Sequence, residues 1–121
     1  MQLPGLVLVN GVVYAAFGLQ CDYGIWDGWL VGVNESSASI TTMWSTEEYV
    51  SDTVMHEPGG GIWQSGSPPV VNSQGDIFIV TGNGDVQAGP LPGNDANANT
   101  SGEAVVELST SGGIQIGRAH V

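Results

Sequence analysis

The sequence predicts an all-β protein built from two consecutive units, each made of four short antiparallel strands. Its 19 glycines mostly separate short apolar runs, a pattern typical of strands joined by tight turns. Hydrophobic residues make up 41% of the 121-residue chain and charged residues 11%, a composition too apolar for a disordered segment. No stretch spaces its apolar residues at helical intervals over the length of an ordinary helix, so helices are not expected.

The two units are recognised by an internal repeat. Residues 4–18 align with residues 68–82 without gaps, so that Gly75 stands 64 positions after Gly11. In each copy an apolar run reaches Asn10-Gly11 or Gln74-Gly75, where glycine supplies the positive φ of a tight turn. A β-branched and aromatic run follows with little polar alternation, which predicts strands buried on both faces.

The third and fourth strands complete each unit. Residues 29–34 correspond to residues 104–109, and fourth strands are expected from Ile40 and from Ile114. Residues 46–57 lack a clean apolar face and are interpreted as a linker. We therefore divide the chain into a first unit with its linker (1–60), a second unit (61–115) and a tail (116–121).

Four antiparallel strands form one blade of a β-propeller, and a propeller needs about 4–8 blades to close its ring. The sequence is thus interpreted as two consecutive four-stranded antiparallel blades of an incomplete β-propeller. The remaining propeller blades of the same parent chain are the expected partners, because two blades alone leave open edges. This piece is accordingly expected to be a fragment.

The tail has a different origin in this interpretation. Residues 116–121 read Ile-Gly-Arg-Ala-His-Val and resemble the translation of a sequencing adapter, so they are predicted to be non-native. Arg118, the one basic residue apart from histidine, falls within them. The alternative is an ordinary terminal strand.

Charge restricts the partners. The formal net charge is −11 and lysine is absent, so nucleic acid and anionic membrane surfaces are poor partners. No apolar stretch approaches the roughly 20 residues of a membrane helix. The acidic surface suits a secreted or periplasmic protein whose signal peptide is not part of this piece.

The single cysteine, Cys21, is interpreted as a small buried residue, with pairing to a thiol elsewhere as the alternative.

Two turn motifs carry a family resemblance. Val33-Asn34-Glu35-Ser36-Ser37 followed by Trp44, and residues 108–113 in the second unit, resemble the turn and docking tryptophan of pyrroloquinoline-quinone-like (quinoprotein-type) propeller repeats. The resemblance implies either a non-catalytic binding or scaffold module of an exported protein, or part of a quinone-dependent dehydrogenase. Pyrroloquinoline quinone and calcium would then be cofactors of the full-length protein only. The lack of a basic partner for the quinone carboxylates favours the scaffold.

The glycine-rich stretch at residues 56–66 holds the candidate site residues. Trp63 is a candidate for stacking against a quinone, because the resemblance implies such a tryptophan and indole supplies a flat face. Packing between the two units is the favoured interpretation of Trp63. His56 and Glu57 are an acid–base or metal-ligand candidate pair, although surface hydrogen bonding explains them as well.

Oxygen-rich loops suggest one metal candidate. Asp85, Asn94 and Asp95 carry oxygen atoms of the kind that Ca²⁺ prefers, but they lack a fixed ligand spacing. Ordinary Asx turns explain these residues without a metal.

Overall fold

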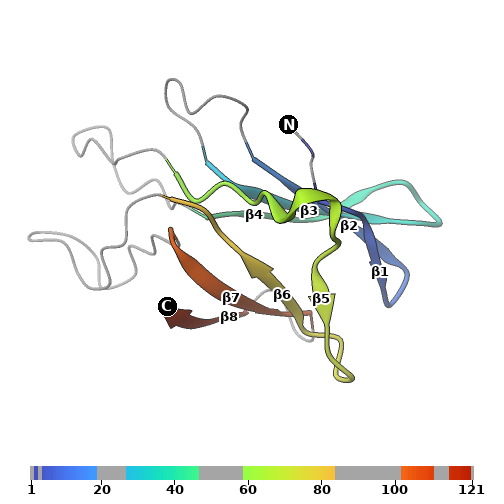
Figure 1. The fold of residues 1–121 in the computed structure, drawn as a ribbon. Helices are drawn as coiled ribbons and strands as arrows, with labels where there is room; N and C mark the ends of the chain where they lie inside the picture. The colour runs from blue at the N-terminus through green and yellow to red at the C-terminus, as the bar shows by residue number, and fades with distance from the viewer. Residues whose placement is uncertain are drawn as a thin grey trace, which may run out of the picture.

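The computed structural model describes residues 2, 4–18, 27–46, 59–83 and 102–110, and the backbone of residues 115–120. These residues form two four-stranded antiparallel sheets with strands in sequence order (Figure 1). The first sheet contains β1 (Val7–Val9), β2 (Val12–Phe17), β3 (Trp29–Asn34) and β4 (Ile40–Ser45), and the second contains β5 (Val70–Val71), β6 (Ile77–Val80), β7 (Ala104–Ser109) and β8 (Gln115–His120). The predicted all-β class and the two antiparallel units are confirmed.

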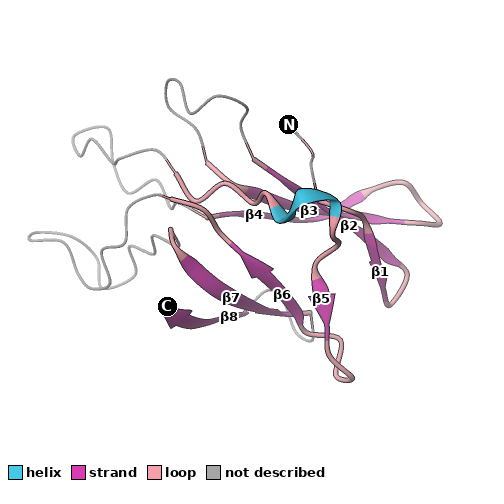
Figure 2. Cartoon of the chain, viewed as in Figure 1, coloured by secondary structure: helices cyan, strands magenta, loops and turns pink. Residues whose placement is uncertain are grey.

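No α-helix occurs in the described ranges; the one helical turn there is the short 3₁₀ segment η1 (Gln64–Gly66), which precedes β5 (Figure 2). The predicted third strands agree with β3 and β7 at both ends. Residues 116–120 of the predicted tail, together with Gln115, pair along the whole of β7 as β8. Backbone pairing of this kind depends little on side-chain identity. It therefore does not test whether these residues are foreign, and their origin stays a prediction.

The two hairpins at the starts of the sheets differ by one residue in register. Val9 pairs with Val12 across a two-residue turn, in which Asn10 and Gly11 both have positive φ, 50° and 78°, as a type I′ turn requires. In the second hairpin Val71 pairs with Ile77, and the longer loop ends at Gly75 with φ 88°. The gapless alignment of the two copies therefore does not extend to their strand pairing.

The longer loop is held by Asn72. Its backbone N–H donates to the Asp76 carbonyl (3.1 Å) and its own carbonyl accepts from the Gly75 N–H (3.1 Å). The Asn72 Oδ1 atom accepts from the N–H groups of Gln74 and Asp76, both at 2.9 Å. This is the pattern of a three-residue loop closed by a left-handed glycine, so glycine is needed in both hairpins but at different places in the turn.

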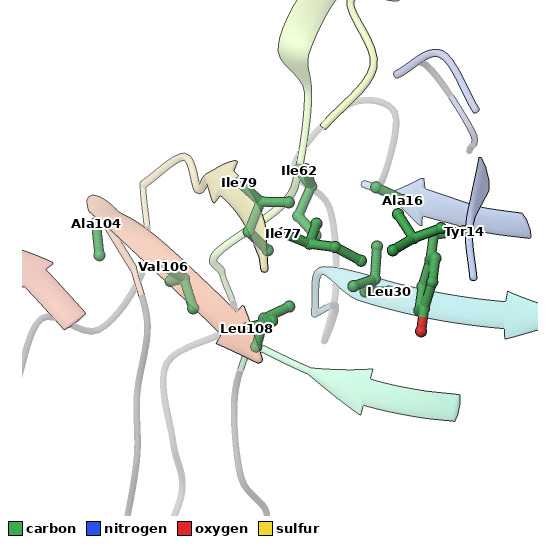
Figure 3. Packing of buried hydrophobic residues seen from close by; sticks show 10 residues of the cluster. Tyr14, Ala16, Leu30, Ile62, Ile77, Ile79, Ala104, Val106 and Leu108 are labelled. Carbon is green, nitrogen blue, oxygen red and sulfur yellow. The ribbon is translucent and has the colours of Figure 1, made fainter. Parts of the chain in front are cut away.

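One apolar core joins the two sheets. From the first sheet it contains Val9, Tyr14, Ala16 and Leu30, and from the rest of the chain Ile62, Ile77, Ile79, Ala104, Val106 and Leu108. Figure 3 shows Ile77 and Ile62 between the side chains of the first sheet and those of β7. Trp44, the predicted docking tryptophan, is partly buried against this cluster.

The two sheets pack through different sets of aligned positions: positions that are buried in one sheet are less buried in the other. Tyr14 and Ala16 point into the core from the first sheet, yet the aligned residues of the second copy, Phe78 and Val80, are partly buried and exposed. Conversely, Ile77 and Ile79 are fully buried, whereas their counterparts Val13 and Ala15 are only partly buried. The third strands behave in the same way: Val106 and Leu108 are buried, and the aligned residues 31 and 33 are not.

The prediction that the second strand of each unit is buried on both faces is wrong for the described residues: Val80 in β6 is 53% exposed, and Val13 and Ala15 in β2 are only partly buried. Leu8 and Met43, 57% and 63% exposed, also lie on the face of the first sheet turned away from the shared core. Among the residues that the structure describes, each sheet packs against one other sheet, and no described layer covers its second face.

Candidate functional site

The junction segment, residues 59–63, connects the two sheets and contains the tryptophan singled out in the sequence. The Ile62 N–H donates to the Phe17 carbonyl at the end of β2 (3.3 Å), and the Gly61 carbonyl accepts from the Gly82 N–H (2.8 Å) just after β6. The Gly60 N–H donates to the Asn83 carbonyl (2.7 Å). Backbone hydrogen bonds therefore tie this segment to both sheets.

A buried threonine supports each side of the junction. The Thr46 hydroxyl accepts from the Gly28 N–H (2.9 Å) and lies 3.3 Å from the carbonyl oxygens of Gly28 and Gly59. In the second sheet the Thr81 hydroxyl accepts from the Ala104 N–H (3.0 Å) and lies 3.2 Å from its carbonyl oxygen. Because both threonines are buried, these hydrogen bonds satisfy backbone groups that water does not reach.

Trp63 lies between two glycines that the repeat aligns with each other. A Cβ atom built on Gly18 would lie 2.9 Å from the indole atoms Cε3 and Cζ3, and one built on Gly82 would lie 2.7 Å from Nε1. The benzene part of the ring thus faces the end of β2 and the pyrrole part faces the end of β6. The side chain is partly buried, and its surroundings are those of packing between the two sheets.

A left-handed turn follows the tryptophan. Gln64 and Ser65 have φ values of 28° and 43°, a region in which non-glycine residues are strained. The Gln64 Oε1 atom is buried and accepts no hydrogen bond from the described residues. The residue that follows the candidate stacking residue in the sequence thus carries a buried acceptor oxygen.

Six of the candidate residues lie outside the described residues: Cys21, His56, Glu57, Asp85, Asn94 and Asp95. Within the part of the chain that the structure describes, no group of three or more His, Cys, Asp or Glu side chains is arranged to hold a metal ion. The calcium and acid–base hypotheses remain predictions.

Sequence reasoning missed the glycines at this junction. Gly28 is so close to the junction segment that a Cβ atom there would lie 2.2 Å from the Gly60 carbonyl oxygen. Gly18 and Gly82 were found as aligned positions of the repeat, but alignment alone does not reveal that they flank one indole ring. The signal that was available is the recurrence of glycine directly after each second strand.

Comparison of the chain with protein-family models, with curated proteins and with solved structures found no match. Among the described residues, no helix has the length and apolar character needed to cross a membrane.

Proposed function

We propose that this chain forms two consecutive blades of a quinoprotein-like β-propeller and acts as a non-catalytic binding or scaffold module of an exported protein. One observation carries the proposal: two sheets built from the same repeat pack through opposite faces. Among the described residues, such a contact leaves the outer face of each sheet uncovered, so further repeats can be added on either side by the same packing. A ring of blades around an axis is the closed form of this arrangement.

The surroundings of Trp63 support a scaffold better than a quinone site. Glycines occupy both ends of the indole ring, and the nearby buried atom of Gln64 is an acceptor. Pyrroloquinoline quinone presents carboxylates and carbonyl oxygens, which are acceptors too and need cationic or donor partners. The chain contains one Arg and no Lys, and that Arg118 belongs to the predicted non-native tail. The described residues therefore do not fit the quinone.

The parent gene tests the propeller. If the proposal is correct, the reading frame carries further copies of the repeat before residue 4 and after Gln115, with proline and glycine at the aligned positions. It also departs from this sequence within residues 116–121. A gene in which the flanking sequence carries no such repeat contradicts the assignment of blades.

Quinone binding tests the non-catalytic part. Equilibrium dialysis of the chain against pyrroloquinoline quinone with Ca²⁺ is expected to show no saturable retention, and a dye-linked dehydrogenase assay with simple alcohols no turnover. The variant Trp63→Phe is the matched control. Saturable retention that is lost in Trp63→Phe would establish Trp63 as the stacking residue and replace the scaffold with the dehydrogenase alternative.

A further inference from the structure

The first sheet has a continuous apolar face turned away from the core. By strand alternation and register its apolar residues are Leu8, Val13, Ala15, Phe17, Trp29, Val31, Val33, Ile40 and Met43, with Ser45 beside Trp29 at one edge. We call it the outer face of the first sheet. None of these residues is charged, and Leu8, Ile40 and Met43 are each more than half exposed. Contiguous apolar surface of this kind marks interaction sites in soluble proteins.

The second sheet also has an apolar outer face, formed by Val70, Phe78, Val80, Val105 and Glu107. Val70 pairs with Phe78, Phe78 with Glu107, and Val80 with Val105, so these residues lie in register on one side. Val70 is 64% exposed and Val80 53%. Glu107 is the one charged residue among them.

The two outer faces carry the same aligned positions as the two buried faces that meet inside the chain, but each set of positions lies on the other sheet. On the first sheet, residues 13, 15, 31 and 33 align with the buried Ile77, Ile79, Val106 and Leu108. On the second sheet, residues 78, 80 and 105 align with the buried Tyr14, Ala16 and Leu30. The outer face of the first sheet thus resembles the buried face of the second sheet, and the outer face of the second sheet resembles the buried face of the first.

We propose that a second copy of this chain docks head to tail, with the outer face of its second sheet on the outer face of the first sheet. This inference rests on the proposed function in taking the two sheets as repeats of one unit, and it concerns the 121-residue chain by itself; in a longer parent chain the neighbouring repeats would occupy the same two faces. The contact is heterologous, so a docked pair still offers one free outer face of a first sheet and one of a second sheet. Such contacts either close into rings or extend without limit. Since propellers hold about 4–8 blades, closed rings would contain about two to four copies.

Area and charge set the strength of this contact. The strands of the two sheets hold two to six residues each, so each face, with strands about 4.8 Å apart, covers on the order of 300 Å² in plan. Stable complexes bury roughly 800 Å² of accessible surface per partner, so this is a small contact, and we expect association to be weak and to depend on protein concentration. The net charge of −11 opposes association, and added salt is expected to strengthen it by screening that repulsion.

A pair of complementary variants tests the geometry. Leu8→Glu with Met43→Glu blocks the outer face of the first sheet, and Val70→Glu with Val80→Glu blocks that of the second. All four residues are more than half exposed, so both double variants should keep the fold, which circular dichroism checks. Ser36→Glu with Ser73→Glu adds the same charge at two exposed turn residues and is the control.

Sedimentation velocity at increasing protein concentration gives the readout. The wild type and the turn control are expected to self-associate, as closed rings of about two to four copies or as longer oligomers, and each blocked variant alone is expected to remain monomeric. An equimolar mixture of the two blocked variants is expected to form a 1:1 heterodimer, because each retains the face that the other lacks.

A mixture that stays monomeric overturns head-to-tail docking, as does a wild type that is monomeric at every concentration tested. Blocked variants that each still dimerise alone indicate a symmetric contact and overturn it as well. These outcomes are separate from failure of the proposed function, which the repeats in the parent gene decide.

Discussion

Replacing Gly28 by alanine is expected to destabilise the protein, although glycine-to-alanine changes at compatible positions stabilise by about 0.4–1 kcal/mol. The added Cβ atom would lie 2.2 Å from the Gly60 carbonyl oxygen and 2.8 Å from Thr46 Cγ2. The junction segment must therefore move by on the order of 1 Å from β3, at an overpacking cost of about 1–3 kcal/mol. The same movement weakens the hydrogen bonds of the Thr46 hydroxyl to Gly28 and Gly59, each worth about 1 kcal/mol.

The net expectation for Gly28→Ala is a loss of about 2–3 kcal/mol in the free energy of unfolding. Urea denaturation followed by tryptophan fluorescence measures it, as a midpoint lowered by about 1–2 M at an unchanged slope. Gly66→Ala is the matched control, because a Cβ atom there meets nothing within 4 Å while φ is +88°. It isolates backbone strain, at about 1 kcal/mol. A Gly28→Ala protein as stable as the wild type would refute the close approach of residues 28 and 60.

Three further predictions follow from the described contacts. Ile62→Ala removes a fully buried side chain between the sheets and should cost about 2–5 kcal/mol in thermal or urea unfolding. Thr81→Val should cost about 1–3 kcal/mol and accelerate hydrogen exchange at the Ala104 amide, which loses its hydroxyl acceptor; an unchanged exchange rate would contradict this. Glu107→Gln removes the charge from the outer face of the second sheet and should tighten self-association several-fold in sedimentation, since burying a carboxylate is costly.

The strands were predictable because their signals are local. Residues 29–34 and 104–109 are short β-branched runs bounded by glycine or polar turns, and they agree with β3 and β7. The glycines at residues 11 and 75 marked both hairpins, since each needs a positive φ there. A repeat of such runs is enough to predict two antiparallel units without any knowledge of their packing.

Packing between the units was not predictable in the same way. Aligned residues such as Tyr14 and Phe78 have similar side chains, so the sequence does not indicate that one is buried and the other is not. That difference depends on which face meets the other sheet. The one-residue change in hairpin register likewise comes from the side chain of Asn72, which ties the longer loop through Asp76. Trp63 illustrates the same limit, because its neighbours Gly18 and Gly82 are distant in sequence from it and from each other.

The placement of Trp63 between Gly18 and Gly82 also affects how such repeats can diversify. The second strands of both sheets end at this ring, and their first turns lie together at the other end, where a Cβ atom on Gly75 would be 3.3 Å from Asn10 Nδ2. The long connections after the two strands therefore start next to each other. Lengthening a flexible connection costs little free energy, so sequence can be inserted after either strand while the contact between the sheets stays unchanged.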